Sequence, residues 1–140
     1  MVPRRNKKLK VPKMTSTKTV SIWVAHTSWD IPTLQQVTTP SYSEDGYFLG
    51  SDFTKAFALD FIDDDLMEAD KVEITNSLPD AIEGFSYDSE ISDSINRNPT
   101  KIPPTDTVVL IYELQYSGTP QKSLIKGKEF IYSGSFEYRE

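Results

Sequence analysis

The sequence predicts a single α+β domain, in which short helices pack on a mixed or antiparallel sheet of about four or more strands. Segments rich in β-branched and aromatic residues alternate with segments that begin with helix-capping residues, in the order β-α-α-β-α-α-β-β. The chain has 140 residues and a mass of 15.9 kDa, which is the size of one ordinary domain. Leu, Ile, Val and Phe supply a quarter of the residues, so the chain can build a core.

The chain is expected to divide into a basic flexible tail at 1–18 and one domain at 19–140. The tail contains seven Lys and Arg residues, two prolines and no acidic residue, and it has too little apolar surface to offset the entropy lost on ordering. Met14 is the expected natural start, with residues 1–13 an extended start. The alternative is that the tail is a basic arm for nucleic acid or an anionic lipid surface.

The first half of the domain is expected to contain a strand and two short helices. Residues 19–25 alternate polar and β-branched side chains, which indicates a strand. Residues 27–30 supply capping side chains for a helix that ends before Pro40, and a loop is expected at 38–50. Ser51 is expected to cap a second helix, which presents one apolar face. Four aromatic side chains are expected in the core, namely Trp23, Phe53, Phe57 and Phe61.

The second half is expected to begin with a helical turn at Leu66 and Met67, capped by one of the preceding aspartates. The remaining elements follow in order: a strand at 72–75, a helix capped by Asn76 or Ser77, a helix within 86–98, a proline-rich linker at 99–104, a strand at 107–114, a turn at 117–120 and a closing strand at 130–138. The strand at 107–114 is nearly continuously apolar, so we expect it inside the sheet with both faces covered. The closing strand is expected to carry a bulge at 133–135, next to Gly134.

Missing residue types and motifs exclude several classes of function. The chain contains no cysteine, which excludes disulfides, cysteine-ligated zinc, iron–sulfur sites and thiol nucleophiles. It contains neither glycine-rich phosphate-binding motif, so a nucleotide enzyme is not expected. No apolar run approaches the roughly 18 residues of a membrane span, and the basic start lacks the apolar segment of a secretory signal. No cofactor is expected.

The acidic residues concentrate in one block, residues 44–93. This block holds fifteen Asp and Glu residues against Lys55 and Lys71, a net charge of −13, whereas the whole chain has a net charge of −6. A surface with this charge repels nucleic acid and attracts basic partners. We therefore expect no direct binding of nucleic acid by the domain.

The densest part of this block leaves several interpretations open. The carboxylates from Asp63 to Glu68 are able to bind calcium or magnesium, but the segment lacks the glycine and final glutamate of a calcium-binding loop. Paired carboxylates also serve glycosidic chemistry when they face each other across a cleft. A third interpretation is a surface that binds a basic protein. The fourth is a solvated face without a partner, and composition favours the last two equally.

Two segments resemble the bacterial immunity protein 22 family, whose members accompany polymorphic and contact-dependent toxins. The first is the strand around Trp23, and the second is the segment from Phe53 to Glu68. The family pattern contains a phenylalanine and a lysine, then an aromatic pair and an Asp-x-Asp pair before a further aromatic residue, a position at which this chain has Leu66. The positions that match are Phe53, Lys55, Phe61, Asp63, Asp65 and Leu66. The resemblance covers residues 19–70.

The resemblance implies a cytoplasmic bacterial protein that is not an enzyme and that binds and neutralises one toxin domain. The expected partner is the C-terminal domain of a large secreted toxin. A nuclease is expected, because many such toxins are nucleases and a nuclease needs a basic surface to hold its substrate. The acidic side chains would occlude the basic cleft of the toxin, and exposed aromatic side chains would anchor the complex. The candidate contact residues are Asp63, Asp64, Asp65, Glu68, Asp70, Trp29, Tyr42 and Tyr47.

Two other classes of function remain open from the sequence. One is a small hydrolase or carbohydrate-active enzyme that uses the Asp63–Glu68 carboxylates or His26, which is the only histidine in the chain. No serine lies in a nucleophile elbow, so His26 is expected to be an ordinary surface or structural residue. The other class is an acidic adaptor module within a larger assembly.

Overall fold

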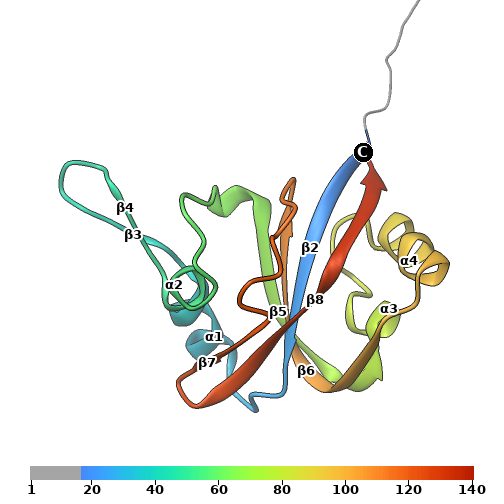
Figure 1. The fold of residues 1–140 in the computed structure, drawn as a ribbon. Coiled ribbons are helices and arrows are strands. Elements are labelled where there is room, and N and C mark those ends of the chain that lie inside the picture. The colour runs from blue at the N-terminus through green and yellow to red at the C-terminus, as the bar shows by residue number, and fades with distance from the viewer. Residues whose placement is uncertain (1–16) are drawn as a thin grey trace, which may run out of the picture.

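The centre of the protein is a five-stranded antiparallel sheet with strand order β5-β6-β2-β8-β7. It is seen in a computed structural model that describes residues 17–140 (Figure 1). The strands are β2 (Thr17–Ala25), β5 (Met67–Ser77), β6 (Lys101–Tyr112), β7 (Lys122–Ile125) and β8 (Lys128–Arg139). Most of the predicted tail, with Met14, lies outside the described residues. Lys18 was predicted in the tail but belongs to β2, where its amine contacts the carboxylate of Glu113 at 2.9 Å.

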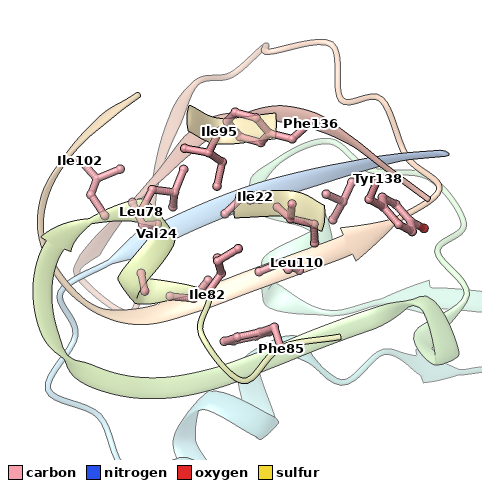
Figure 2. Packing of buried hydrophobic residues seen from close by; sticks show 14 of the residues in the cluster. Ile22, Val24, Leu78, Ile82, Phe85, Ile95, Ile102, Leu110, Phe136 and Tyr138 are labelled. Atoms are coloured by element: carbon pink, nitrogen blue, oxygen red, sulfur yellow. The ribbon is translucent and has the colours of Figure 1, made fainter. Parts of the chain in front are cut away.

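Helices cover both faces of the sheet, as Figure 1 shows. Helices α1 (Ile31–Thr38) and α2 (Asp52–Ala56) lie on one face, and α3 (Leu78–Ala81) and α4 (Asp88–Arg97) lie on the other. Figure 2 shows the cluster beneath α3 and α4, in which Ile82 and Ile95 meet Ile22 and Leu110 of the sheet. The prediction of an α+β domain is confirmed.

Successive side chains of the inner strands point to opposite faces of the sheet. They therefore divide the core into two clusters, one beneath α1 and α2 and one beneath α3 and α4. In β2, Val20 and Ile22 point toward α3 and α4, whereas Trp23 belongs to the cluster beneath α1 and α2. In β6, Leu110 and Ile111 divide in the same way. Because β6 is paired on both edges and buried on both faces from residue 107 to 112, the predicted inner strand is confirmed.

A bulge in β8 reverses which side chains of this strand point to each face of the sheet. Ile22 is opposite Gly134, but its neighbour Trp23 is opposite Tyr132, so Ser133 is the extra residue. As a result, Phe130 and Phe136 pack in opposite core clusters although both have even numbers. The predicted bulge is confirmed.

The predicted capping residues begin their helices. Asp30 accepts a hydrogen bond from the backbone N–H of Thr33 at 2.9 Å, and Ser51 forms a reciprocal capping box with Thr54. Ser77 caps α3 by accepting from the backbone N–H of Asp80 at 3.4 Å. Asp63 caps a short 3-10 turn, η2 (Asp64–Leu66), by accepting from the N–H of Asp65 at 3.0 Å. Met67, however, belongs to β5 and not to this turn.

Several sequence-based expectations are wrong. The expected linker at 99–104 is in large part the start of β6, because the strand passes through Pro103 and Pro104 in an irregular stretch of pairing with β5. The expected strand at 72–75 is only part of the eleven-residue β5. The expected loop at 38–50 contains a hairpin of β3 (Ser41–Tyr42) and β4 (Phe48–Gly50), and β7 was not expected. Phe61 was expected in the core, yet it is 64% exposed.

Candidate partner-binding surface

The hairpin β3–β4 extends away from the sheet and carries exposed aromatic rings (Figure 1). The ring of Tyr42 lies 5.8 Å from that of Phe48, and Phe48 lies 5.4 Å from Phe61. Tyr47, at the tip, is 71% exposed. We call Tyr42, Tyr47, Phe48 and Phe61 the aromatic cluster. Phe48 is half-buried, whereas the other three rings are exposed. Exposed aromatic rings grouped in this way are typical of a protein-binding surface.

An acidic turn adjoins the aromatic cluster along the chain, since Asp63 follows Phe61 by two residues. The acidic turn comprises Asp63, Asp64 and Asp65, and all three side chains are exposed. Asp63 also has a structural role, because it caps η2. One carboxylate oxygen from each residue falls within 4.8 Å of the others. Because the three groups are fully in contact with water, this proximity alone does not define a metal site.

The carboxylate of Glu68 is held by two residues that are distant in the sequence, unlike those of the acidic turn. It accepts hydrogen bonds from the backbone N–H and the hydroxyl of Ser86 at 2.9 and 2.8 Å. The hydroxyl of Tyr112 donates to it at 2.6 Å. Burial, together with this carboxylate, raises the pKa of Tyr112 well above its ordinary value. Glu68 therefore joins β5 to the segment between α3 and α4.

The other predicted residues occupy different surroundings. Asp70 is exposed and accepts from the N–H of Lys71 at 2.8 Å. Trp29 was expected to be exposed, but it is half-buried, with its ring 5.7 Å from that of Phe130. His26 is exposed at the end of β2. Within residues 17–140, no hydrogen bond joins His26 to a serine or a carboxylate.

The sequence analysis missed a network around Asp106. The carboxylate accepts from the backbone N–H groups of Thr27 and Ser28 at 2.8 and 2.9 Å, and from the hydroxyl of Thr107 at 2.8 Å. The amine of Lys71 lies 3.2 Å from it. Burial by itself would raise the pKa of Asp106, but these donors and the Lys71 charge lower it to about 2.

This network occupies one of the two positive charges within residues 44–93. The Lys71 amine also donates to the Thr27 hydroxyl at 3.0 Å, and its side chain is largely covered. Of the two lysines in residues 44–93, one is therefore paired internally with Asp106, a residue outside the block. No short sequence motif indicates this pairing, because Lys71 and Asp106 are far apart in the sequence.

The sequence comparison decides which family the chain belongs to. The model of the family Immunity protein 22 matches residues 20–139. The chain belongs to this family. No curated protein and no solved structure matches the chain. The match extends beyond residues 19–70, where the sequence motifs lie, and covers both the acidic turn and the closing strand.

Membership of Immunity protein 22 implies that the chain neutralises a cognate toxin, and such proteins are typically not enzymes. The residues gathered on its surface agree with a binding role, because aromatic and carboxylate side chains lie together on exposed elements. No helix within residues 17–140 is long and apolar enough to cross a membrane.

Proposed function

We propose that this Immunity protein 22 member neutralises a nuclease toxin by covering the substrate-binding cleft of the toxin with an acidic and aromatic surface. The observation that carries the proposal is the position of the acidic turn beside the aromatic cluster. The hairpin β3–β4 projects from the helix-covered sheet (Figure 1), and the contact between Phe48 and Phe61 places it against the chain just before the acidic turn, so a partner is able to reach both.

Charge supports a basic partner. Residues 44–93 carry a net charge of −13, and a nuclease needs a basic cleft to hold phosphate groups. The carboxylates of Asp64 and Asp65 have no internal hydrogen-bond donors within residues 17–140, so they are free to take the place of substrate phosphates. Such charges mainly raise the association rate and select the partner.

Aromatic side chains supply the lifetime of the complex. Tyr42, Tyr47 and Phe61 have large exposed rings, and a few aromatic anchors commonly dominate the energy of a protein interface. Contacts between the rings of Tyr42, Phe48 and Phe61 hold the cluster in place before binding. Less entropy is then lost on association. Trp29 contributes only the part of its ring that Phe130 leaves exposed.

The proposal is tested by isolating the partner and assaying its chemistry. The full chain serves as bait in lysate of the source cell, with washes at low and high salt, and mass spectrometry identifies the retained protein. The captured domain is then expressed alone and mixed with DNA and RNA. We expect it to degrade one of them, and we expect an equimolar amount of this chain to stop the degradation.

Two outcomes separate the parts of the proposal. A captured toxin domain that is blocked by this chain but leaves nucleic acid intact would support the immunity role and show that the toxin is not a nuclease. A captured nuclease that remains fully active in the complex would remove occlusion as the mechanism.

A further inference from the structure

The strand β5 forms one edge of the sheet, and within residues 17–140 it is paired only with β6. Its first five residues, Met67 to Lys71, pair with residues 111 to 107 of β6 in unbroken register. The outer edge of such a strand offers backbone N–H and C=O groups to another strand. The N–H of Lys71 is already bonded to the Asp70 carboxylate at 2.8 Å, so an added strand has to displace that carboxylate or pair with the other groups. Five residues match the commonest length of a strand in globular proteins.

A groove of about 900 Å³ runs along this edge from Met67 to Thr75. Its far wall is the end of α3 and the following loop, at Asp80, Glu83 and Phe85. Glu68 fixes the width of the groove at one end, because its hydrogen bonds to Ser86 hold the loop beside β5. The groove is therefore bounded by β5 on one side and by the end of α3 with its following loop on the other.

The groove selects for positive charge. Five carboxylates line it, those of Glu68, Asp70, Glu73, Asp80 and Glu83. The only basic side chain in the lining is Lys71, whose amine is turned to Asp106 and Thr27. Ile74, which is 57% exposed, adds an apolar contact at the other end.

The groove also resists unwanted pairing. Register is lost between Lys71 and Thr75, where β5 has extra residues opposite β6. Bulges and charges are the devices by which natural edges avoid aggregation. Here the bulge limits pairing to residues 67–71, and the carboxylates repel acidic strands while attracting basic ones. The bulge and the carboxylates, which prevent aggregation, therefore also favour one kind of partner, a short basic strand.

We infer that the β5 edge receives a basic extended segment of a partner protein, which adds to the sheet as an antiparallel or parallel strand beside Met67–Lys71. Main-chain hydrogen bonds supply the affinity, and Lys or Arg side chains paired with the groove carboxylates supply the selectivity. This inference goes beyond the proposed function, because it does not require the segment to come from a toxin.

The test uses the full chain and a fluorescein-labelled peptide of four Lys-Val repeats, with binding followed by fluorescence anisotropy at low and moderate salt. A second peptide is identical except for N-methyl groups on all of its backbone nitrogens, which block both hydrogen-bonding edges but keep the charge. A third replaces each Lys with Glu. We expect saturable binding of the first peptide only, and protection of amides within residues 67–71 from hydrogen exchange in the complex.

Two charge-reversal variants locate the site. Glu73→Lys with Glu83→Lys places positive charge in the groove and is expected to weaken binding about tenfold. Asp64→Lys with Asp65→Lys makes the same change in the acidic turn, outside the groove lining, and is expected to weaken it less than about threefold. Circular dichroism with thermal melting checks that both variants remain folded.

Three results would overturn the inference. Equal binding of the N-methylated peptide would show attraction by charge without strand addition. Equal loss in the two variants would remove the groove as the site. Sedimentation that shows the chain associating with itself, with this association lost in the Glu73→Lys with Glu83→Lys variant, would assign the edge to a second copy. Because a peptide is the probe, none of these results bears on whether the chain neutralises a toxin.

Discussion

Among single residues, Asp106 has the environment with the clearest consequence for stability. It ties the segment after β2 to β6 and to Lys71 of β5. Its pKa is lowered from 3.8 to about 2. A carboxyl group whose pKa is lower in the folded state stabilises that state above the unfolded pKa, and the stabilisation is lost as the pH falls through the folded pKa. The contribution of Asp106 is thus complete near neutral pH and disappears between about pH 4 and pH 2.

Replacing Asp106 with Asn is therefore expected to reduce the free energy of unfolding at pH 7 by about 1–2 kcal/mol. Urea denaturation of both proteins at a series of pH values measures the difference. The difference should shrink as the pH falls from about 5 toward about 2. A difference that stays constant over this range would show that the ionised carboxylate is not the source of the stability.

Glu68 provides a second prediction at this scale. Because it accepts three hydrogen bonds from Ser86 and Tyr112, Glu68→Ala should reduce the free energy of unfolding by about 2 kcal/mol. Asp65→Ala is the matched control, since its exposed carboxylate accepts none of the hydrogen bonds found in residues 17–140. Its effect should remain within about 0.5 kcal/mol. Equal stability of the two variants in thermal or urea melts would show that the Glu68 contacts contribute nothing.

Residue roles that depend on neighbours in the chain could be predicted from the sequence, and those that depend on distant residues could not. The caps at Asp30, Ser51 and Asp63 follow from contacts within three residues. The exposure of Phe61 could not be read from its apolar character, because it depends on where the hairpin β3–β4 lies. The acids at Asp64 and Glu68 look alike in the sequence, yet only Glu68 meets Tyr112.

Among the elements, β8 depends most on one backbone conformation. Gly134 lies at the bulge with a φ of 134°, and a Cβ added there would lie 3.1 Å from the ring of Phe136. Gly134→Ala is expected to reduce the free energy of unfolding by about 2 kcal/mol, through backbone strain and the close contact with the ring.

Gly127→Ala is the control for this variant. Gly127 also has a positive φ, of 78°, but an added Cβ would meet no atom within 4 Å. Its cost should be about 1 kcal/mol, from backbone strain alone. Chemical denaturation of the two variants measures the contrast. A cost at Gly127 that equals or exceeds the cost at Gly134 would show that the ring contact does not matter.

The strands that were missed or shortened share a physical cause. β6 begins at Lys101 and includes Pro103 and Pro104, which ordinarily indicate a loop because proline lacks a backbone donor. Irregular pairing with β5 at this point accommodates them. β7 has only four residues, and Leu124 is exposed at the edge of the sheet, so its hydrophobic pattern is weak. Burial on both faces made residues 107–112 far easier to predict.

For the whole molecule, the distribution of charge is uneven, and the proposed basic partner follows from it. A net charge of −13 lies in residues 44–93, whereas residues 94–140 have a net charge of +1. The elements in the acidic block include the hairpin tip, the acidic turn and β5. We expect the complex with a basic toxin domain to associate more slowly as salt increases, because screening reduces the steering effect of these charges.

The position of the charge, and not only its total, is expected to matter. Asp64→Lys with Asp65→Lys should slow association with the captured toxin domain about tenfold at low salt. Glu129→Lys with Glu137→Lys, two exposed positions on β8, makes the same change in net charge away from the aromatic cluster. Stopped-flow fluorescence compares the two rates. Equal slowing would show that the partner responds to net charge alone.

Protection of cells by these variants tests most directly whether the acidic turn and the aromatic cluster bind the toxin. The captured toxin domain is expressed from an inducible promoter together with the wild-type chain, the Asp64–Asp65 variant, the Glu129–Glu137 variant or the double variant Tyr47→Ala with Phe61→Ala. We expect growth with the wild-type chain and with the Glu129–Glu137 variant, and arrest with the other two, at equal protein levels. Full protection by the Asp64–Asp65 variant and by the aromatic variant would contradict the proposed binding surface, because neither of its parts would then be needed to neutralise the toxin.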